Sequence, residues 1–255
     1  MSWIKFLGTA GSRFVVFKQL RASGGIWINY AGKNLLLDPG PGCLVRCVES
    51  RPKLDPMTLD YIVLSHRHLD HCADVNTMIE AMTEGGFSPR GSLIAPLDAL
   101  EGEDRVVLRY LRGYLHEVKV LEEGKFELGS FILEAVPLVH HGVQTFGFRL
   151  FCEGEPSLSF IIDTRFVDYI PLKLGADIMV LNVTLHGKRE HIDHLCLDDA
   201  RKIVSEARPK LAILTHFGRG MLFKRPWVLA EEISKELNLK VKAAYDGMRL
   251  DLSVL

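Results

Sequence analysis

The segment from residue 61 to residue 71 reads Tyr61-Ile62-Val63-Leu64-Ser65-His66-Arg67-His68-Leu69-Asp70-His71. Its apolar first part predicts a short buried strand, and three imidazoles and one carboxylate follow that strand within six residues. Imidazole and carboxylate are the ligands that zinc and similar divalent cations prefer. A strand that ends in four such donors indicates metal binding, with enough donors to begin two sites. A solvated polar loop, or a histidine-rich tract that binds metal without chemistry, is the alternative.

Further metal donors recur later in the chain, again directly after apolar runs. His140 and His141 follow one such run, Asp163 follows a second, and His216 follows a third. Each run predicts a strand, and a strand end is rigid, so the core holds a ligand placed there in position. A lone residue of this kind is usually a capping or hydrogen-bonding group. Several of them together with the cluster at residues 66–71 indicate a metal centre.

Composition predicts a single globular domain over residues 1–255. The chain has 255 residues, 47% of them hydrophobic, and contains no segment typical of a linker or a repeat. Its formal net charge is −1, so the protein as a whole carries no field that would gather nucleic acid or acidic membranes. A local basic rim around a site is compatible with that net charge.

The cysteines and the apolar segments predict the compartment. Five scattered cysteines argue against a disulfide scaffold and favour a reducing environment. The N-terminal region lacks the apolar core of a signal peptide, and no segment approaches the roughly 20 apolar residues that a membrane span needs. We therefore expect a soluble, cytoplasmic protein with no membrane partner.

Short apolar or alternating runs predict many strands in the first half of the chain and an alternation of strands and helices in the second. Strands are expected at residues 3–7, 25–30, 34–37, 61–64, 131–136, 146–151, 158–162, 178–181 and 211–214. Helices are expected at residues 44–48, 73–83, 106–114, 197–206 and 226–237. Two mostly antiparallel sheets with helices outside would bury the apolar faces, which predicts an α+β or α/β sandwich.

The histidine cluster resembles the HxHxDH signature of the metallo-β-lactamase fold hydrolases, with its donors at His66, His68, Asp70 and His71. Four further features resemble the same superfamily: an opening strand and turn, an Asp-x-Gly turn, a metal-bridging aspartate and a last histidine ligand. They lie at residues 7–12, 37–40, 163–164 and 215–217. The resemblance implies a four-layer αβ/βα sandwich. Within the superfamily the chain resembles the phosphodiesterase branch: tRNase Z without its tRNA-gripping arm, and the cyclic phosphodiesterase of phosphonate breakdown.

The resemblance also implies a site for two divalent metal ions. The implied ligands are His66, His68 and one of His140 and His141 for the first ion, Asp70, His71 and His216 for the second, and Asp163 as the bridge. We prefer His140 to His141, because the strand before it should fix its depth. In the redox-active di-iron members a glutamate typically replaces His68, so an imidazole there favours hydrolysis. Zinc is the expected ion, with manganese or iron as alternatives.

Asp70 and His194 are the residues expected to serve catalysis. His194 resembles the extra histidine that phosphodiesterase members carry before a helix, where it can protonate the leaving oxygen or hydrogen-bond the phosphate. Imidazole suits that role because it gains and loses a proton near neutral pH. The alternative is a surface histidine near a helix start, and we expect His186 and His191 to be loop residues rather than ligands.

The expected activity is hydrolysis of a small or nucleotide-like phosphodiester, with a metal-bridging hydroxide as the nucleophile. Hydrolysis of a carboxylic ester, thioester or lactam is the second hypothesis, and a non-catalytic metal-binding protein is the third. The intervals between His141, Asp163 and His194 are too short for a tRNA-gripping arm. The expected partner is therefore a small molecule or a nucleotide rather than tRNA, and a homodimer is compatible with the sequence.

Overall fold

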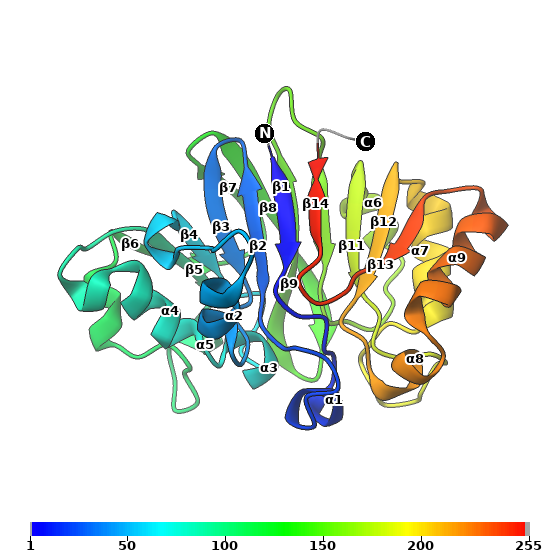
Figure 1. Ribbon diagram of the computed structural model, residues 1–255, viewed down its shortest axis with the longest axis horizontal. Helices are drawn as coiled ribbons and strands as arrows, with labels where there is room; N and C mark the ends of the chain where they lie inside the picture. Colours follow the sequence, from blue (N-terminus) through cyan, green and yellow to red (C-terminus); the bar gives the residue numbers. More distant parts are fainter. Residues whose placement is uncertain (1, 253–255) are drawn as a thin grey trace. The chain divides into compact units, whose positions relative to one another are not determined.

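The computed structural model describes residues 2–252, which form two compact units (Figure 1). Of this range, the first unit contains residues 2–8, 22–122 and 246–252, and the second contains residues 9–21 and 123–245. Each unit has its own seven-stranded sheet. Because neither unit is continuous in sequence, both depend on pairing between distant parts of the chain. The expectation of a single domain over residues 1–255 stays a prediction.

The sheet of the first unit has the strand order β14-β1-β2-β3-β4-β5-β6. Neighbouring strands are antiparallel from β14 to β3 and parallel from β3 to β6. Ala31 and Gly32 have positive φ angles of 49° and 79°, as a tight hairpin turn between β2 and β3 requires. The strands are β1 (Trp3–Phe6), β2 (Ile26–Tyr30), β3 (Lys33–Leu37), β4 (Tyr61–Val63), β5 (Ser92–Pro96), β6 (Glu117–Leu121) and β14 (Arg249–Asp251).

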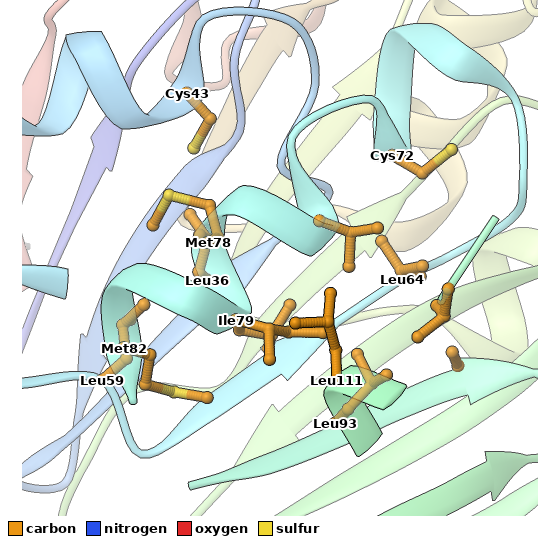
Figure 2. Close-up of a cluster of buried hydrophobic side chains, with 14 of the residues drawn as sticks. Leu36, Cys43, Leu59, Leu64, Cys72, Met78, Ile79, Met82, Leu93 and Leu111 are labelled. Atoms are coloured by element: carbon orange, nitrogen blue, oxygen red, sulfur yellow. The ribbon is translucent and has the colours of Figure 1, made fainter. Parts of the chain in front are cut away.

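Helical segments connect the parallel strands of the first unit and cover their core (Figure 2). In α4, Met78, Ile79 and Met82 are fully buried in one cluster with the strand residues Leu36 and Leu93. Burying each such side chain is worth roughly 1.5–3 kcal/mol, so α4 anchors the chain that leaves the histidine cluster. The segments are α2 (Cys43–Glu49), η1 (Pro56–Thr58), α3 (Leu69–Cys72), α4 (Val75–Met82), η2 (Glu84–Gly86), α5 (Leu97–Leu100) and η3 (Tyr110–Tyr114).

The sheet of the second unit has the strand order β13-β12-β11-β10-β9-β8-β7. Its neighbours are antiparallel from β7 to β10 and parallel from β10 to β13. The strands are β7 (Gly124–Leu128), β8 (Phe131–His140), β9 (Val143–Phe151), β10 (Leu158–Ile161), β11 (Ile178–Asn182), β12 (Leu211–Thr215) and β13 (Val241–Ala243). Strands β10, β11 and β12 are buried along their whole length, as expected for a parallel region that is covered on both faces.

The helices of the second unit are α1 (Arg13–Phe17), α6 (Ile170–Lys173), α7 (Leu197–Ala207), α8 (Arg219–Phe223) and α9 (Pro226–Leu237). Helix α7 begins where two acidic residues predict it. The side chain of Asp199 accepts a hydrogen bond from the backbone N–H of Cys196 at 2.9 Å, and Asp198 also lies in the first turn, where the helix dipole favours negative charge. Among the described residues, no helix has both the length and the apolarity of a membrane span.

Most of the expected strands and helices are present, but the strands pair differently from the expectation. All nine expected strands are present, as are the helices expected near residues 44–48, 197–206 and 226–237. The helix expected at residues 73–83 is present as α4, whereas of the helix expected at residues 106–114 only the 3-10 segment η3 forms. The expectation of two mostly antiparallel sheets is wrong, because both sheets are mixed. Helix-containing connections, such as those after β3 and β4, permit parallel pairing that strand patterns alone do not reveal.

Candidate metal centre

The donors of the first unit lie directly after β4. His66 is fully buried, and its ring centroid lies 4.8 Å from that of His68 and 4.2 Å from that of His71. His68 has an extended backbone and caps the short helix α3, which carries Asp70 and His71. The turn of α3 brings Nε2 of His71 to 3.9 Å from Oδ2 of Asp70. Because zinc ligands lie about 2.0–2.2 Å from the ion, two atoms at that separation can bind the same ion.

Asp38 orients this first donor set from the end of β3. Its carboxylate accepts hydrogen bonds from the backbone N–H and the hydroxyl of Ser65 at 2.7 and 2.6 Å, and it lies 2.9 Å from Nδ1 of His71. Asp38 has a φ of 52°, an uncommon conformation for a residue other than glycine. A Cβ on Gly40 would lie 2.1 Å from the backbone oxygen of Asp70, so the turn approaches the donors as only glycine permits. The Asp-x-Gly turn therefore positions the cluster.

The donors of the second unit surround Asp163, which follows β10 and is almost completely buried. Its Oδ1 accepts a hydrogen bond from Asn182 Nδ2 at 2.8 Å and lies 3.1 Å from Nδ1 of His216. Its Oδ2 lies 3.7 Å from Nε2 of His140 and 3.6 Å from Nδ1 of His194. One carboxylate thus contacts imidazoles from three separate segments, a dense arrangement that a purely structural core does not require.

His216 and His194 share one orienting hydroxyl. The Thr184 Oγ1 atom lies 3.0 Å from Nδ1 of His216 and 3.1 Å from Nδ1 of His194, and the two rings stack at 6.2 Å. His216 has a φ of 57°, and a Cβ on Gly11 would lie 2.1 Å from its backbone oxygen. Strained conformations of this kind persist where the surroundings hold them, commonly at functional sites.

The neighbours His140 and His141 differ sharply in their surroundings. His140 is 2% exposed, and its Nδ1 lies 2.8 Å from the backbone oxygen of Asp193. Burial lowers the pKa of His140 to about 4 in the metal-free chain, although the nearby carboxylate of Asp163 opposes that shift. His140 is therefore neutral at pH 7, the form that binds metal. The side chain of His141 is 39% exposed, so within this unit it is His140 that lies beside Asp163.

The two histidines that were expected to be loop residues, His186 and His191, are both exposed. His194 is brought into the second donor set: with His140 and His141 it forms a group whose ligand atoms lie within 4.8 Å of one another. Among the residues that orient the donors, the sequence analysis identified only Asp38, through its Asp-x-Gly turn. A polar residue at the end of an apolar run was a usable signal for Ser65 and Asn182 but not for Thr184 and Asp193.

The chemistry of both donor sets fits divalent metal ions. An oxygen atom lies within hydrogen-bond distance of Nδ1 in His66, His71, His140 and His216. Metal-binding histidines typically have such a partner on one ring nitrogen, because it fixes the tautomer and leaves the other nitrogen, here Nε2, to the metal. Neutral imidazole and carboxylate suit zinc and several other divalent ions.

Comparison with known proteins agrees with this chemistry. Residues 33–217 match the β-lactamase superfamily domain family, a span that includes the donors of both sets. A protein of Methanocaldococcus jannaschii, MJ1374, is 32% identical over 257 residues, which cover 98% of this chain and 94% of that protein. Ribonuclease Z of Nanoarchaeum equitans is 25% identical over 141 residues, 54% of this chain and 42% of the enzyme. The chain therefore spans less than half of the length of that enzyme.

Two solved structures resemble the whole chain. The metallo-β-lactamase fold protein YhfI of Bacillus subtilis matches with a TM-score of 0.78 at 19% identity, over 98% of both chains. A diphosphatase of the PhnP family matches with a TM-score of 0.72 at 22% identity, also over 98% of both chains. These likenesses confirm the fold class, and the relatives include the two families that the sequence resembles. The chain belongs to the β-lactamase superfamily and is a metal-dependent hydrolase with the metallo-β-lactamase fold.

Proposed function

We propose that the chain is a dinuclear phosphodiesterase that acts on a small or nucleotide-like phosphodiester. The observation that carries the proposal is the placement of Asp163. Its Oδ1 lies beside His216, and its Oδ2 lies beside His140, two histidines that would bind different ions. A carboxylate with one oxygen toward each of two ligand groups is suited to bridging two cations.

The proposed ligands are those that the superfamily resemblance implies. His66, His68 and His140 would hold the first ion, Asp70, His71 and His216 would hold the second, and Asp163 would bridge. Seven donors exceed what one tetrahedral ion can use, which favours two ions per chain. The predominance of imidazole favours zinc over manganese or iron. When bound, such a pair of ions supplies an activated water and positive charge for the phosphoryl oxygens.

His194 is proposed to give a proton to the leaving oxygen. Its side chain is 13% exposed, so it can reach substrate, while Thr184 holds Nδ1 at 3.1 Å and fixes the ring. The carboxylate of Asp163 lies 3.6 Å from that nitrogen. An alkoxide leaving group needs such a donor, because it is too basic to leave without a proton. Asp70 is proposed to serve catalysis as a ligand of the second ion.

Two kinds of relative support a phosphorus-containing substrate over a carboxylic ester, thioester or lactam: ribonuclease Z and the PhnP-family diphosphatase. The third hypothesis, a non-catalytic metal-binding protein, is disfavoured by the complete donor set. A cytoplasmic location belongs to the same proposal. The five cysteines, none of them in a disulfide, suit a reducing compartment.

The substrate class is tested by a screen on metal-quantified protein. Bis-p-nitrophenyl phosphate, a thioester and a lactam would be offered at equal concentration to the wild type and to His186→Ala, a control variant at an exposed histidine outside the donor sets. We expect turnover of the phosphodiester to exceed that of the other two by at least about 10²-fold, and the control to match the wild type. Preferential turnover of the thioester or the lactam would overturn the proposal.

A further inference from the structure

Two segments of the second unit are basic, aromatic and free of acidic residues. Residues 9–21 contain Arg13, Lys18 and Arg21, and residues 217–228 contain Arg219, Lys224 and Arg225, with no aspartate or glutamate in either segment. The formal net charge of the whole chain is only −1, so this concentration of positive charge is local. A local concentration of basic residues is compatible with the small net charge of the chain, and these two segments provide one.

The two segments are held side by side in the fold. Phe217 N–H donates a hydrogen bond to Thr9 oxygen at 2.9 Å, and Gly11 N–H donates to Phe217 oxygen at 3.0 Å. Beyond these bonds, the guanidinium of Arg219 on α8 lies 5.2 Å from the centroid of the Phe14 ring on α1. The pairing begins one residue after His216, so the joined segments extend directly from a proposed metal ligand.

Aromatic rings are exposed on both helices. Phe14 and Phe17 of α1 contact each other edge to face at 6.0 Å and are 39% and 67% exposed. Phe223 of α8 is 82% exposed and lies four residues after Arg219, which places the two side chains on the same face of the helix. Large exposed aromatic side chains that are close together commonly mark an interaction surface. We define the α1–α8 surface as Arg13, Phe14, Phe17, Lys18, Arg219 and Phe223.

The cations of the α1–α8 surface are not neutralised by carboxylates. Across residues 2–252, no carboxylate lies within ion-pair distance of Arg13, Lys18 or Arg219, all of which are exposed. Other basic side chains of the chain do form such pairs, for example Arg112 with Glu101 and Arg201 with Glu236. Basic charge without acidic partners attracts a polyanion, and it is costly to bury against an ordinary protein surface.

We propose that the α1–α8 surface binds single-stranded nucleic acid, with bases stacked on Phe17 and Phe223 and phosphates beside Lys18 and Arg219. Interleaved aromatic and basic side chains are the combination that binds single strands without sequence preference. Helix α1 has only five residues, too short for an amphipathic helix that inserts into a membrane. The inference rests on the proposed phosphodiesterase function and specifies its substrate as an oligonucleotide that this surface holds close to His216.

The test measures binding, so its outcome does not depend on catalysis. The metal-loaded wild type would be titrated into a fluorescein-labelled oligouridylate of about ten nucleotides with phosphorothioate linkages, which resist cleavage, and anisotropy would be recorded. We expect Phe17→Ser with Phe223→Ser to weaken binding at least about tenfold, since stacking on each ring contributes. The matched control is Phe87→Ser, at a phenylalanine of the first unit that is more exposed than Phe17 and Phe223, and it should bind as the wild type does.

A charge variant and a second ligand complete the test. Lys18→Gln with Arg219→Gln should reduce the salt dependence of binding. The slope of the logarithm of the binding constant against the logarithm of the salt concentration should become shallower by about 0.7 for each phosphate contact that is lost. Equal oligonucleotide affinity of wild type and both double variants would overturn the inference. Binding to phosphatidylglycerol vesicles without binding to the oligonucleotide would also overturn it. Turnover of bis-p-nitrophenyl phosphate with no oligonucleotide binding would remove this inference alone. Oligonucleotide binding with no phosphodiester turnover would remove the proposed activity and leave the α1–α8 surface as a binding site only.

Discussion

The two donor sets are built in opposite ways. In the first unit, four donors come from the six residues 66–71, and one short helix, α3, completes their arrangement. In the second unit, three histidines from separate segments meet around Asp163, so their arrangement depends on the sheet. The first set depends on local turns and one orienting carboxylate. The second depends on long-range pairing and shared orienting groups, so a change at its centre should affect more contacts.

The largest effect is expected from Asp163→Asn. The variant keeps the shape of the side chain but removes the charge that faces three histidines and, in our proposal, two metal ions. We expect it to lose metal and at least about 10³-fold in kcat/KM together. Elemental analysis alongside phosphodiester turnover measures both. Asp168→Asn, at a side chain that is 94% exposed, is the control, and full activity in Asp163→Asn would refute the bridge.

A smaller effect is expected from His194→Ala, which tests whether the second set contains a residue for chemistry rather than for metal retention. Metal content should stay at the wild-type value, while kcat falls by about 10²–10⁴ on substrates with poor leaving groups. The loss should shrink for p-nitrophenolate, which leaves without a proton. An equal loss on both substrates would indicate phosphate binding instead, and no loss on either would show that His194 has no part in the chemistry.

The first donor set is tested through its orienting carboxylate. Asp38→Asn keeps the hydrogen-bonding shape but removes the charge beside His71 Nδ1, so the ring is held less firmly and is a weaker ligand. We expect metal affinity to fall about 10–100-fold, as measured by competition with a chelator. Asp104→Asn, at a side chain that is 82% exposed, controls for the loss of one charge. Unchanged affinity would show that the cluster needs no such partner.

The smallest effect concerns the pH dependence of the metal-free protein. Because the pKa of His140 is about 4 in the folded state and about 6.5 in the unfolded chain, the unfolded chain binds the proton more readily. The free energy of unfolding should therefore fall as the pH drops from 6.5 towards 4, by about 1–2 kcal/mol at pH 5. In urea denaturation at pH 7 and pH 5, the free energy of unfolding of His140→Gln should fall by less than that of the wild type. An identical fall in both proteins would contradict the conclusion that His140 is buried and neutral.

The sequence predicted the local parts of this molecule well. The run from Tyr61 to Leu64 and its donors need only a strand and a turn, so their pattern is visible in neighbouring residues. His140, Asp163 and His216 could be found because each follows an apolar strand, and the resemblance to a known superfamily linked them and pointed to His194. The preference for His140 over His141 came from the sequence, and the structure adds that only His140 is buried, because adjacent residues at the end of a strand face opposite ways.

The parts that depend on long-range contacts were not predictable. The parallel pairing of β3 with β4 depends on how the segment that connects them packs against the sheet. No single strand carries that information. The role of Thr184 depends on its position between His194 and His216, which are distant in sequence. Helix α1 has five residues, and its contacts with the segment after β12 rather than its own helical propensity account for its position.

The most direct test of the account is the number of metal ions that one chain binds. Native mass spectrometry of the zinc-loaded wild type would count them, with His186→Ala as a matched histidine variant at an exposed position. The two donor sets and their bridge predict two ions per chain in both proteins, and a marked loss of bound zinc in Asp163→Ala. A ceiling of one ion, unchanged by Asp163→Ala, would contradict the dinuclear site.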